Sequence, residues 1–284
     1  MPNALAPIGV FDSGVGGLSV LRALARALPH DDLLYVGDTA RIPYGSKPLP
    51  MVRAFADELA AFLLARGVKA LVVACNTASA AALPELADRL DVPVWGVVEP
   101  GVAAALSVTR GGTIGVLGTP GTVGANAYQA PLGRAGVAVW ARACPLFVPI
   151  VEEGVSDGEI ALLVARHYLR DLPEDLDTVI LGCTHYPALI RTLGAVLGPD
   201  VVLVDSAETT AAVVADGLAS AGLAAPPRAG RSISHLVTGD LPTYRHTATA
   251  LGWLEGDVAP LALSELRGSA GVVPSPIVVA EASR

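Results

Sequence analysis

The sequence predicts an α/β protein made of two similar domains with mainly parallel sheets. Three observations support this prediction. Short apolar runs alternate with longer amphipathic segments, a set of motifs recurs 106 to 109 residues later, and each copy carries a cysteine directly after an apolar run. Alternating strands and helices are typical of parallel sheets covered by helices.

The expected strands are short apolar runs bounded by polar residues, glycine or proline. In chain order they are residues 8–11, 33–36, 71–74, 94–97, 114–117, 137–140, 179–181 and 201–204. Most are separated by segments long enough for helices, among them 18–28, 52–65, 78–90 and 159–169. Ligands bind beyond the carboxyl ends of the strands in such sheets, so we expect the functional groups there.

The recurring motifs indicate an internal duplication. The segment IGVFDSG at 8–14 is echoed by IGVLGT at 114–119, and VVACNT at 72–77 is echoed by ILGCTH at 180–185. A third pair, VWGVVE at 94–99 and LVDSAE at 203–208, has nearly the same offset. Similarity at one offset is the signature of a repeated structural unit. Two such domains facing each other would present Cys75 and Cys183 to one cleft.

The composition excludes several classes of protein. Of 284 residues, 52% are hydrophobic and 16% charged, which excludes disorder for most of the chain. A net charge of −8 disfavours nucleic acid as a partner. No segment has the 20 or so apolar residues of a membrane span, and the start lacks the features of a signal peptide. Three cysteines without a CxxC motif add to the expectation of a cytoplasmic protein.

Cys75 lies at the start of a predicted helix, directly before Asn76 and Thr77. Unpaired N–H groups at a helix start favour a thiolate, so we expect a lowered pKa, with Asn76 and Thr77 as helix caps and ligand donors. A buried structural cysteine is an equally good interpretation of this position alone.

Cys183 also follows an apolar run, and Pro187 then opens a helix. His185 is close enough in sequence to act as its proton partner. Recurrence of the cysteine at the repeat offset favours a catalytic role over a structural one. Cys144 has no counterpart in the first copy, and we interpret it as structural.

The glycine-rich turn after Asp12 could be read as a dinucleotide-binding loop with Asp38 as the ribose acid, but the third glycine of that fingerprint falls at Ser19. We favour a turn that offers N–H groups to a small anion. The loop 41–48 is suited to covering a ligand. The five histidines lack zinc-ligand spacing, and neither lysine is an obvious Schiff-base residue, so we expect no metal and no organic cofactor.

Together these residues resemble the glutamate racemase family from residue 8 to about 256. The motifs that carry the resemblance are FDSGVGG (11–17), YVGDTARIPYG (35–45), ACNTAS (74–79), CPLFVPIVEEG (144–154), GCTHYP (182–187), DSAETTA (205–211) and TGD (238–240). The resemblance implies cofactor-independent interconversion of L- and D-glutamate, which supplies D-glutamate for peptidoglycan. It also implies two pseudo-symmetric domains with the active site in the cleft between them, from residues 1–98 plus 210–267 and residues 99–209, followed by an extension at 268–284.

The same resemblance implies the roles of individual residues. Cys75 and Cys183 are the two bases, Asp12 assists Cys75, and His185 assists Cys183. Glu152 and Asp38 match acidic positions of less defined role. The expected substrate-binding residues are Asp12, Ser13, Tyr44, Gly45, Asn76, Thr77, Thr119, Thr122, Thr184 and His185. Ala125 departs from the family, which often has Ser there. Relatives often form homodimers, but no interface can be read from the sequence.

Three other functions stay open at this stage. One is a sister racemase acting on aspartate or another small acid. Another is a cysteine hydrolase with His185 as base, which leaves the second matched thiol unexplained. The third is a two-domain binding protein that clasps a small anion, in which serine at both cysteines would be harmless.

Overall fold

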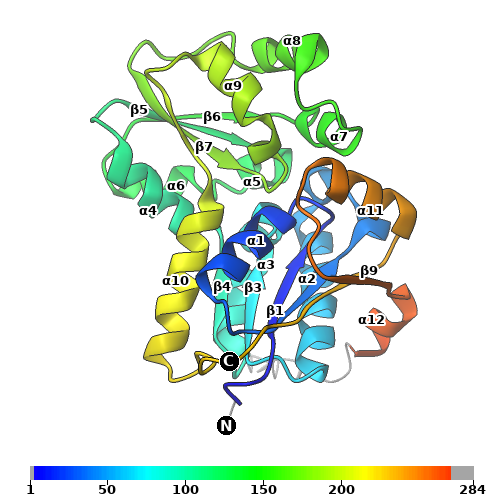
Figure 1. Cartoon of the computed structure of the whole chain (residues 1–284). Helices are drawn as coiled ribbons and strands as arrows, with labels where there is room; N and C mark the ends of the chain where they lie inside the picture. Colours follow the sequence, from blue (N-terminus) through cyan, green and yellow to red (C-terminus); the bar gives the residue numbers. More distant parts are fainter. Residues whose placement is uncertain (1–2, 270–284) are drawn as a thin grey trace, which may run out of the picture.

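The computed structural model describes residues 3–269 and contains two parallel β-sheets covered by helices. Figure 1 shows the two sheets in separate domains, with the second domain above the first. Every strand pairing within the described part of the chain is parallel. The α/β fold with two domains expected from the sequence is therefore confirmed.

The first domain is built on a six-stranded sheet with the strand order β10-β9-β2-β1-β3-β4. Its strands are β1 (Ile8–Asp12), β2 (Leu33–Gly37), β3 (Ala70–Val73), β4 (Val94–Gly96), β9 (Ile233–Val237) and β10 (Asp257–Pro260). The second domain has a four-stranded sheet with the order β6-β5-β7-β8. Its strands are β5 (Thr113–Gly118), β6 (Val139–Ala143), β7 (Leu176–Gly182) and β8 (Val202–Val204).

The two sheets repeat one topology. β1 pairs with β2 and β3, and β3 pairs with β4. In the second domain β5 pairs in the same way with β6 and β7, and β7 with β8. The motifs that recur in the sequence thus occupy equivalent strands, and the two cysteines follow the equivalent strands β3 and β7.

Helices cover both faces of each sheet. Those of the first domain are α1 (Leu18–Ala27), α2 (Leu49–Ala65), α3 (Asn76–Arg89), α10 (Ser206–Ser220), α11 (Leu241–Ala250) and α12 (Leu263–Ser269). Those of the second domain are α4 (Val98–Val108), α5 (Pro120–Gly124), α6 (Gln129–Arg134), α7 (Phe147–Glu152), α8 (Gly158–Tyr168) and α9 (Ile190–Leu197). Short 3₁₀-helices are η1 (Thr39–Arg41), η2 (Tyr44–Ser46) and η3 (Tyr186–Leu189).

Side-chain alternation along the strands divides the first domain's core between the two faces of its sheet. Val10 belongs to a buried cluster with α1, α10 and α11, whereas the next residue, Phe11, belongs to a cluster with α2, α3 and α12. Successive side chains of a strand point to opposite faces, so a strand buried on both sides reads as a continuous apolar run. That is why the central strands could be recognised in the sequence.

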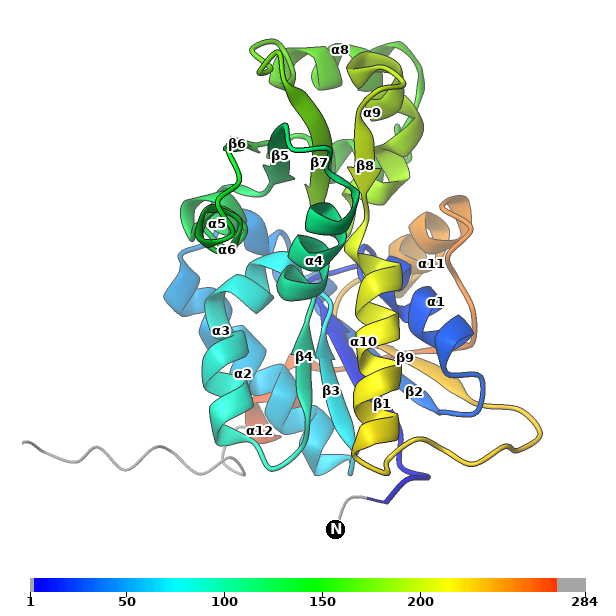
Figure 2. The same cartoon turned by 90° about the vertical axis from the view of Figure 1, so that its left-hand side faces the viewer.

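The chain passes between the domains twice, once from β4 into α4 and once from β8 into α10. Figure 2 shows α4 and α10 side by side at this passage, and the two helices are in contact. After β8 the chain returns to add α10, β9, α11 and β10 to the first domain. We keep the division into residues 1–98 plus 210–267 and 99–209 as a proposal.

Strands β9 and β10 were not expected from the sequence. Every second residue of β9, Ser234 and Leu236, is only half-buried, and β10 is a short edge strand with a single buried residue, Val258. Neither forms the continuous apolar run that marks the central strands. The expected strand 137–140 begins two residues too early, because Val137 lies between the turn at 135–136 and the start of β6.

Two further expectations concern the ends of the chain and membranes. The extension expected at 268–284 lies, from residue 270 onwards, outside the described residues. Among residues 3–269, no helix combines the length and apolar character needed to cross a bilayer.

Candidate active site

Cys75 lies at the carboxyl end of β3, as the residue that caps the N-terminus of α3. It is 5% exposed, and its Sγ atom is 4.0 Å from the Oγ atom of Ser13. The expected lowering of its pKa is wrong. Burial raises the pKa of Cys75, the charge of Asp12 raises it further, and the N–H groups of Ala78 and Thr77 lower it by less. At rest this residue is therefore a neutral thiol.

The expected capping role of Asn76 and Thr77 is also wrong, because both residues already belong to the first turn of α3. Asn76 accepts a hydrogen bond from the Tyr128 hydroxyl on its Oδ1 atom. Thr77 instead contacts the second domain through its hydroxyl. Both side chains therefore lie at the interface of the two domains, where they hydrogen-bond to residues of the second domain.

Asp12 ends β1 and organises the glycine turn that follows. Its Oδ2 atom accepts hydrogen bonds from the N–H groups of Gly14 and Gly17, at 3.0 and 3.1 Å. Its Oδ1 atom accepts one from the Thr184 hydroxyl of the second domain at 3.2 Å. Burial raises the pKa of Asp12, and these donors with the charge of His185 act against that rise. No hydrogen bond joins Asp12 to Cys75 in residues 3–269, so any influence on this thiol is through space.

Cys183 lies in the equivalent position of the second domain, directly after β7. Its Sγ atom is 3.9 Å from Nδ1 of His185, and Nε2 of His185 is 2.5 Å from Oε1 of Glu152. Burial lowers the pKa of His185, but its hydrogen bonds to Cys183 and Glu152 outweigh burial and hold the pKa well above its ordinary value. The ring is therefore an imidazolium at neutral pH, paired with a carboxylate.

Three threonine hydroxyls meet where the N-termini of α3 and α5 approach each other. The Oγ1 atom of Thr77 is 2.9 Å from that of Thr119 and 3.3 Å from that of Thr122. Thr119 and Thr122 are 3.1 Å apart, and Thr119 caps α5 by accepting the N–H of Thr122. Hydroxyls and N–H groups at helix N-termini are suited to binding an anion.

The loop around η2 covers the site from the first domain. The Tyr44 hydroxyl donates to Asp38, which also accepts from Arg41 and from the Thr238 hydroxyl. Burial and the charge of Asp38 raise the pKa of Tyr44 well above its usual range, so this phenol stays protonated. A Cβ atom on Gly45 would lie 2.4 Å from Cβ of Thr119, so only glycine allows this close approach. Asp38 thus holds the covering loop without lining the pocket.

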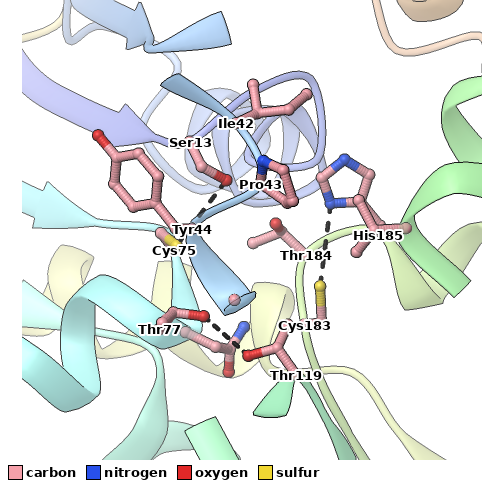
Figure 3. A pocket seen from close by; sticks show the side chains of 13 residues that line it. Ser13, Ile42, Pro43, Tyr44, Cys75, Thr77, Thr119, Cys183, Thr184 and His185 are labelled. Atoms are coloured by element: carbon pink, nitrogen blue, oxygen red, sulfur yellow. Dashed lines mark hydrogen bonds between the residues drawn. The ribbon is translucent and has the colours of Figure 1, made fainter. Parts of the chain in front are cut away.

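A single pocket brings both thiols together (Figure 3). Ser13 and Cys75 lie on one side, and Cys183, Thr184 and His185 on the other. The lining residues are Ser13, Ile42, Pro43, Tyr44, Gly45, Cys75, Asn76, Thr77, Thr119, Val148, Cys183, Thr184 and His185. The cavity measures about 20 Å³, which is room for about one water molecule.

Most of the residues expected at the site line this pocket, whereas Asp12, Glu152 and Thr122 lie behind residues that do. Ile42, Pro43 and Val148 line the pocket without having been expected there. Ile42 and Pro43 belong to the loop expected to cover a ligand, but Val148 carries no chemical signal in the sequence. Cys144 is fully buried in the core of the second domain and is not part of the pocket.

The arrangement can move protons on two opposite sides of a small bound molecule. Each domain supplies one thiol, and hydroxyls and helix N-termini supply donors for negatively charged oxygens. Residues 3–269 contain no cluster of three or more His, Cys, Asp or Glu side chains placed to hold a metal ion.

The chain is similar to known racemases in sequence and in structure. Residues 8–214 match the family model described as Asp/Glu/Hydantoin racemase. The chain is 58% identical over 266 residues to the glutamate racemase of Thermus thermophilus, covering 94% of this chain and 100% of that relative.

Two solved structures share the fold over nearly their whole length. One is the T. thermophilus glutamate racemase in complex with β-chloro-D-alanine, with a TM-score of 0.84, 57% identity, and coverage of 93% of this chain and 99% of that one. The other is the Francisella tularensis glutamate racemase in complex with D-glutamate, with a TM-score of 0.85, 34% identity, and coverage of 92% and 98%.

Proposed function

This chain belongs to the glutamate racemase family of isomerases, and we propose that it interconverts L- and D-glutamate by proton transfer through two cysteines, without a cofactor. The observation that carries the mechanism is that Cys75 and Cys183, from equivalent strands of opposite domains, line one pocket. In the F. tularensis relative the bound molecule is D-glutamate, which supports the choice of substrate.

Racemisation removes the α-proton from one face of the substrate and returns a proton to the other. One base would have to cross the plane of the carbanion, whereas two thiols on opposite faces need not move. One cysteine acts as thiolate and the other as thiol, and the two exchange roles when the direction reverses. In the free enzyme Cys75 is the thiol, because burial and Asp12 raise its pKa. The positive ammonium group of the substrate favours a thiolate when it binds.

The neighbours of each thiol support this division of roles. On the second domain, the imidazolium of His185 lies beside Cys183 and is held by Glu152, so a positively charged proton donor faces this thiol. On the first domain, Asp12 holds the turn that carries Ser13, whose hydroxyl faces Cys75. Asp12 thus influences Cys75 in two ways: it positions Ser13 beside the thiol, and its charge raises the pKa of the thiol.

The carbanion is the difficult intermediate, because no cofactor delocalises its charge. Donors fixed before the reaction stabilise developing charge best when water is excluded. Thr77, Thr119, Thr184 and the N-terminus of α3 supply such donors around the pocket. The protein as a whole carries a charge of −8, so an anionic substrate must be held by these local groups.

The pocket is too small for glutamate as it stands, since about 20 Å³ holds about one water. Binding therefore requires the two domains to separate and close again over the substrate. Hydrogen bonds across the interface, such as Thr184 to Asp12 and Thr77 to Thr119, would break on opening and re-form around the ligand. Closure also excludes water from the carbanion.

We further propose that the product D-glutamate is used for peptidoglycan in the cytoplasm. The direct test of the reaction is to follow the optical rotation of L-glutamate, with and without prior dialysis against a chelator. We expect rotation to fall to zero in both samples. Activity that returns only after adding a metal or pyridoxal phosphate would contradict the cofactor-free mechanism.

The same assay with aspartate tests the substrate. We expect a much lower kcat/KM for aspartate than for glutamate, and comparable values would overturn the proposed specificity. A binding protein would take up glutamate without changing its rotation. A cysteine hydrolase would leave rotation intact and be inactivated by loss of one thiol only.

A further inference from the structure

Tyr128 forms a hydrogen bond that joins the two domains at the pocket. It lies in the second domain between α5 and α6 and is fully buried. Its hydroxyl donates to Oδ1 of Asn76 at 2.5 Å, and Asn76 is the first residue of α3 and the neighbour of Cys75. The bond therefore reaches from a buried ring of one domain to a pocket residue of the other.

The ring of Tyr128 is held in a slot lined by two glycines. A Cβ atom on Gly101 of α4 would lie 3.2 Å from Cε1 of the ring, and one on Gly182 of β7 would lie 3.1 Å from Cε2. Around it pack the buried apolar side chains of the core between α4, α6 and the second sheet. Because the ring cannot turn aside, the position of its hydroxyl is fixed.

The direction of the hydrogen bond follows from the chemistry of its two ends, since the Oδ1 atom of an asparagine can only accept. Burial raises the pKa of Tyr128, so the phenol is neutral and has one proton to donate. An interaction with the side chain of Ser206, the first residue of α10, lowers this pKa by less than burial raises it. The Tyr128 proton is then free for Oδ1 of Asn76.

An asparagine side chain has one acceptor end and one donor end. With Oδ1 occupied by Tyr128, the Nδ2 end of Asn76 makes no hydrogen bond to any residue in the described range 3–269, although the side chain lines the pocket. This Nδ2 atom is not among the fully buried side-chain atoms of the described residues that lack a partner, so it is open to the pocket. The amide is thus set as a donor facing the place of the substrate.

We propose that Tyr128 is a positioning residue for the racemase, which fixes the amide of Asn76 with its NH₂ group toward an anionic oxygen of the bound amino acid. The inference rests on the proposed function. Since the bond crosses between the domains, the amide takes this orientation only when the domains are closed. Tyr128 thereby couples closure of the two domains to recognition of the substrate.

The test is a double-mutant cycle of Tyr128→Phe and Asn76→Ala, with kcat and KM measured for both enantiomers of glutamate. Tyr128→Phe keeps the ring in its slot and removes only the hydroxyl. We expect it to raise KM about fivefold to tenfold, the effect of one hydrogen bond, with kcat changed far less. Asn76→Ala should raise KM more, and Tyr128→Phe should add nothing in the Asn76→Ala background.

Tyr168→Phe is the matched control, because it also removes a buried hydroxyl of the second domain, one that accepts the N–H of Leu146 away from the pocket. It should lower Tm without changing KM. If Tyr128→Phe fails to fold, Gly101→Ala replaces it, since the added methyl presses on the same ring and should raise KM in the same way.

Two outcomes overturn the inference alone. One is an equal rise of KM from Tyr128→Phe with and without Asn76, and the other is an unchanged KM in a folded Tyr128→Phe protein. Failure of the unaltered chain to racemise glutamate would instead overturn the proposed function, and the inference with it.

Discussion

His185 and Glu152 form a partly buried pair in which Nε2 of the ring lies 2.5 Å from Oε1 of the carboxylate. The opposite ring nitrogen faces Cys183. Burial alone would lower the pKa of His185, and the two partners reverse that effect. A histidine whose folded pKa is raised contributes stability that is full below its unfolded pKa of about 6.5 and is lost as pH rises through the folded value.

The first prediction concerns Glu152→Gln. Without the carboxylate charge the pKa of His185 falls, so the imidazolium beside Cys183 is lost at lower pH. We expect the alkaline limb of the pH profile of kcat/KM to move toward neutral pH. Glu153→Gln removes the same charge from an exposed neighbour and should leave the profile in place. An unmoved limb in Glu152→Gln would show that this carboxylate does not set the charge of His185.

The second prediction concerns the threonine hydroxyls at the meeting of α3 and α5. Thr119→Val and Thr122→Val keep the shape of the side chains and remove the hydroxyls that bond to each other and to Thr77. We expect KM to rise about tenfold to a hundredfold for Thr119→Val, as for a hydrogen bond to a charged group. Thr122→Val should have a smaller effect, because its hydroxyl lies behind that of Thr119.

Thr192→Val provides the control for these variants. Thr192 is a buried threonine of the same domain whose hydroxyl donates to Ser156 O at 2.8 Å, outside the pocket. It should lower Tm and leave KM unchanged. Equal KM values for Thr119→Val and Thr192→Val would exclude Thr119 from substrate binding.

The third prediction concerns stability in acid. Asp177 accepts hydrogen bonds from the hydroxyls of Thr109 and Thr178 and from the N–H groups of Arg110 and Gly112. Burial raises the pKa of Asp177, but these donors outweigh it and lower the pKa to about 2. A depressed folded pKa gives stability that is present above the unfolded value of about 3.8 and is lost as pH falls toward 2.

Asp177→Asn should therefore lower Tm by several degrees at pH 7, and the difference from the unaltered protein should shrink between pH 4 and pH 2. Thermal unfolding followed by circular dichroism measures both. Asp171→Asn removes a carboxylate whose side chain is 70% exposed and should change Tm little at any pH. If the Tm difference between Asp177→Asn and the unaltered protein stays constant from pH 4 to pH 2, the four donors do not act by stabilising the charge of Asp177.

The sequence located the two thiols because each follows a strand buried on both faces, and such strands read as uninterrupted apolar runs. Duplication then related Cys75 to Cys183, although they are far apart in the chain. Strands β9 and β10 lack that signal, since Ser234 and Asp257 are not core residues.

Properties that depend on tertiary packing could not be predicted. The direction of the pKa shift of Cys75 follows from how completely the folded protein buries it within the cluster of Phe11, α2 and α3, and this burial outweighs the N-terminus of α3. The contact of Tyr128 with Asn76 and the place of Val148 in the pocket arise only when the domains meet. No local pattern in the sequence encodes these contacts.

The last prediction is that each of the two cysteines exchanges protons on only one face of the substrate. Cys75→Ala and Cys183→Ala should each abolish racemisation, because every turnover needs a base on one side and an acid on the other. The duplicated topology places the thiols after equivalent strands, β3 and β7. Cys144→Ala is the matched control, since it removes a third buried thiol that does not line the pocket, and it should keep the activity.

Each single variant should still remove a proton from the face that its remaining thiol contacts. A glutamate analogue with a leaving group on the β-carbon then loses the α-proton to that thiolate and expels the leaving group, forming a double bond in one step. Cys75→Ala and Cys183→Ala should therefore consume opposite enantiomers of the analogue. By resemblance to the family, we expect Cys75 to serve the D-form and Cys183 the L-form. Near-normal racemisation by either single variant, or elimination from the same enantiomer by both, would exclude a mechanism with one base on each face.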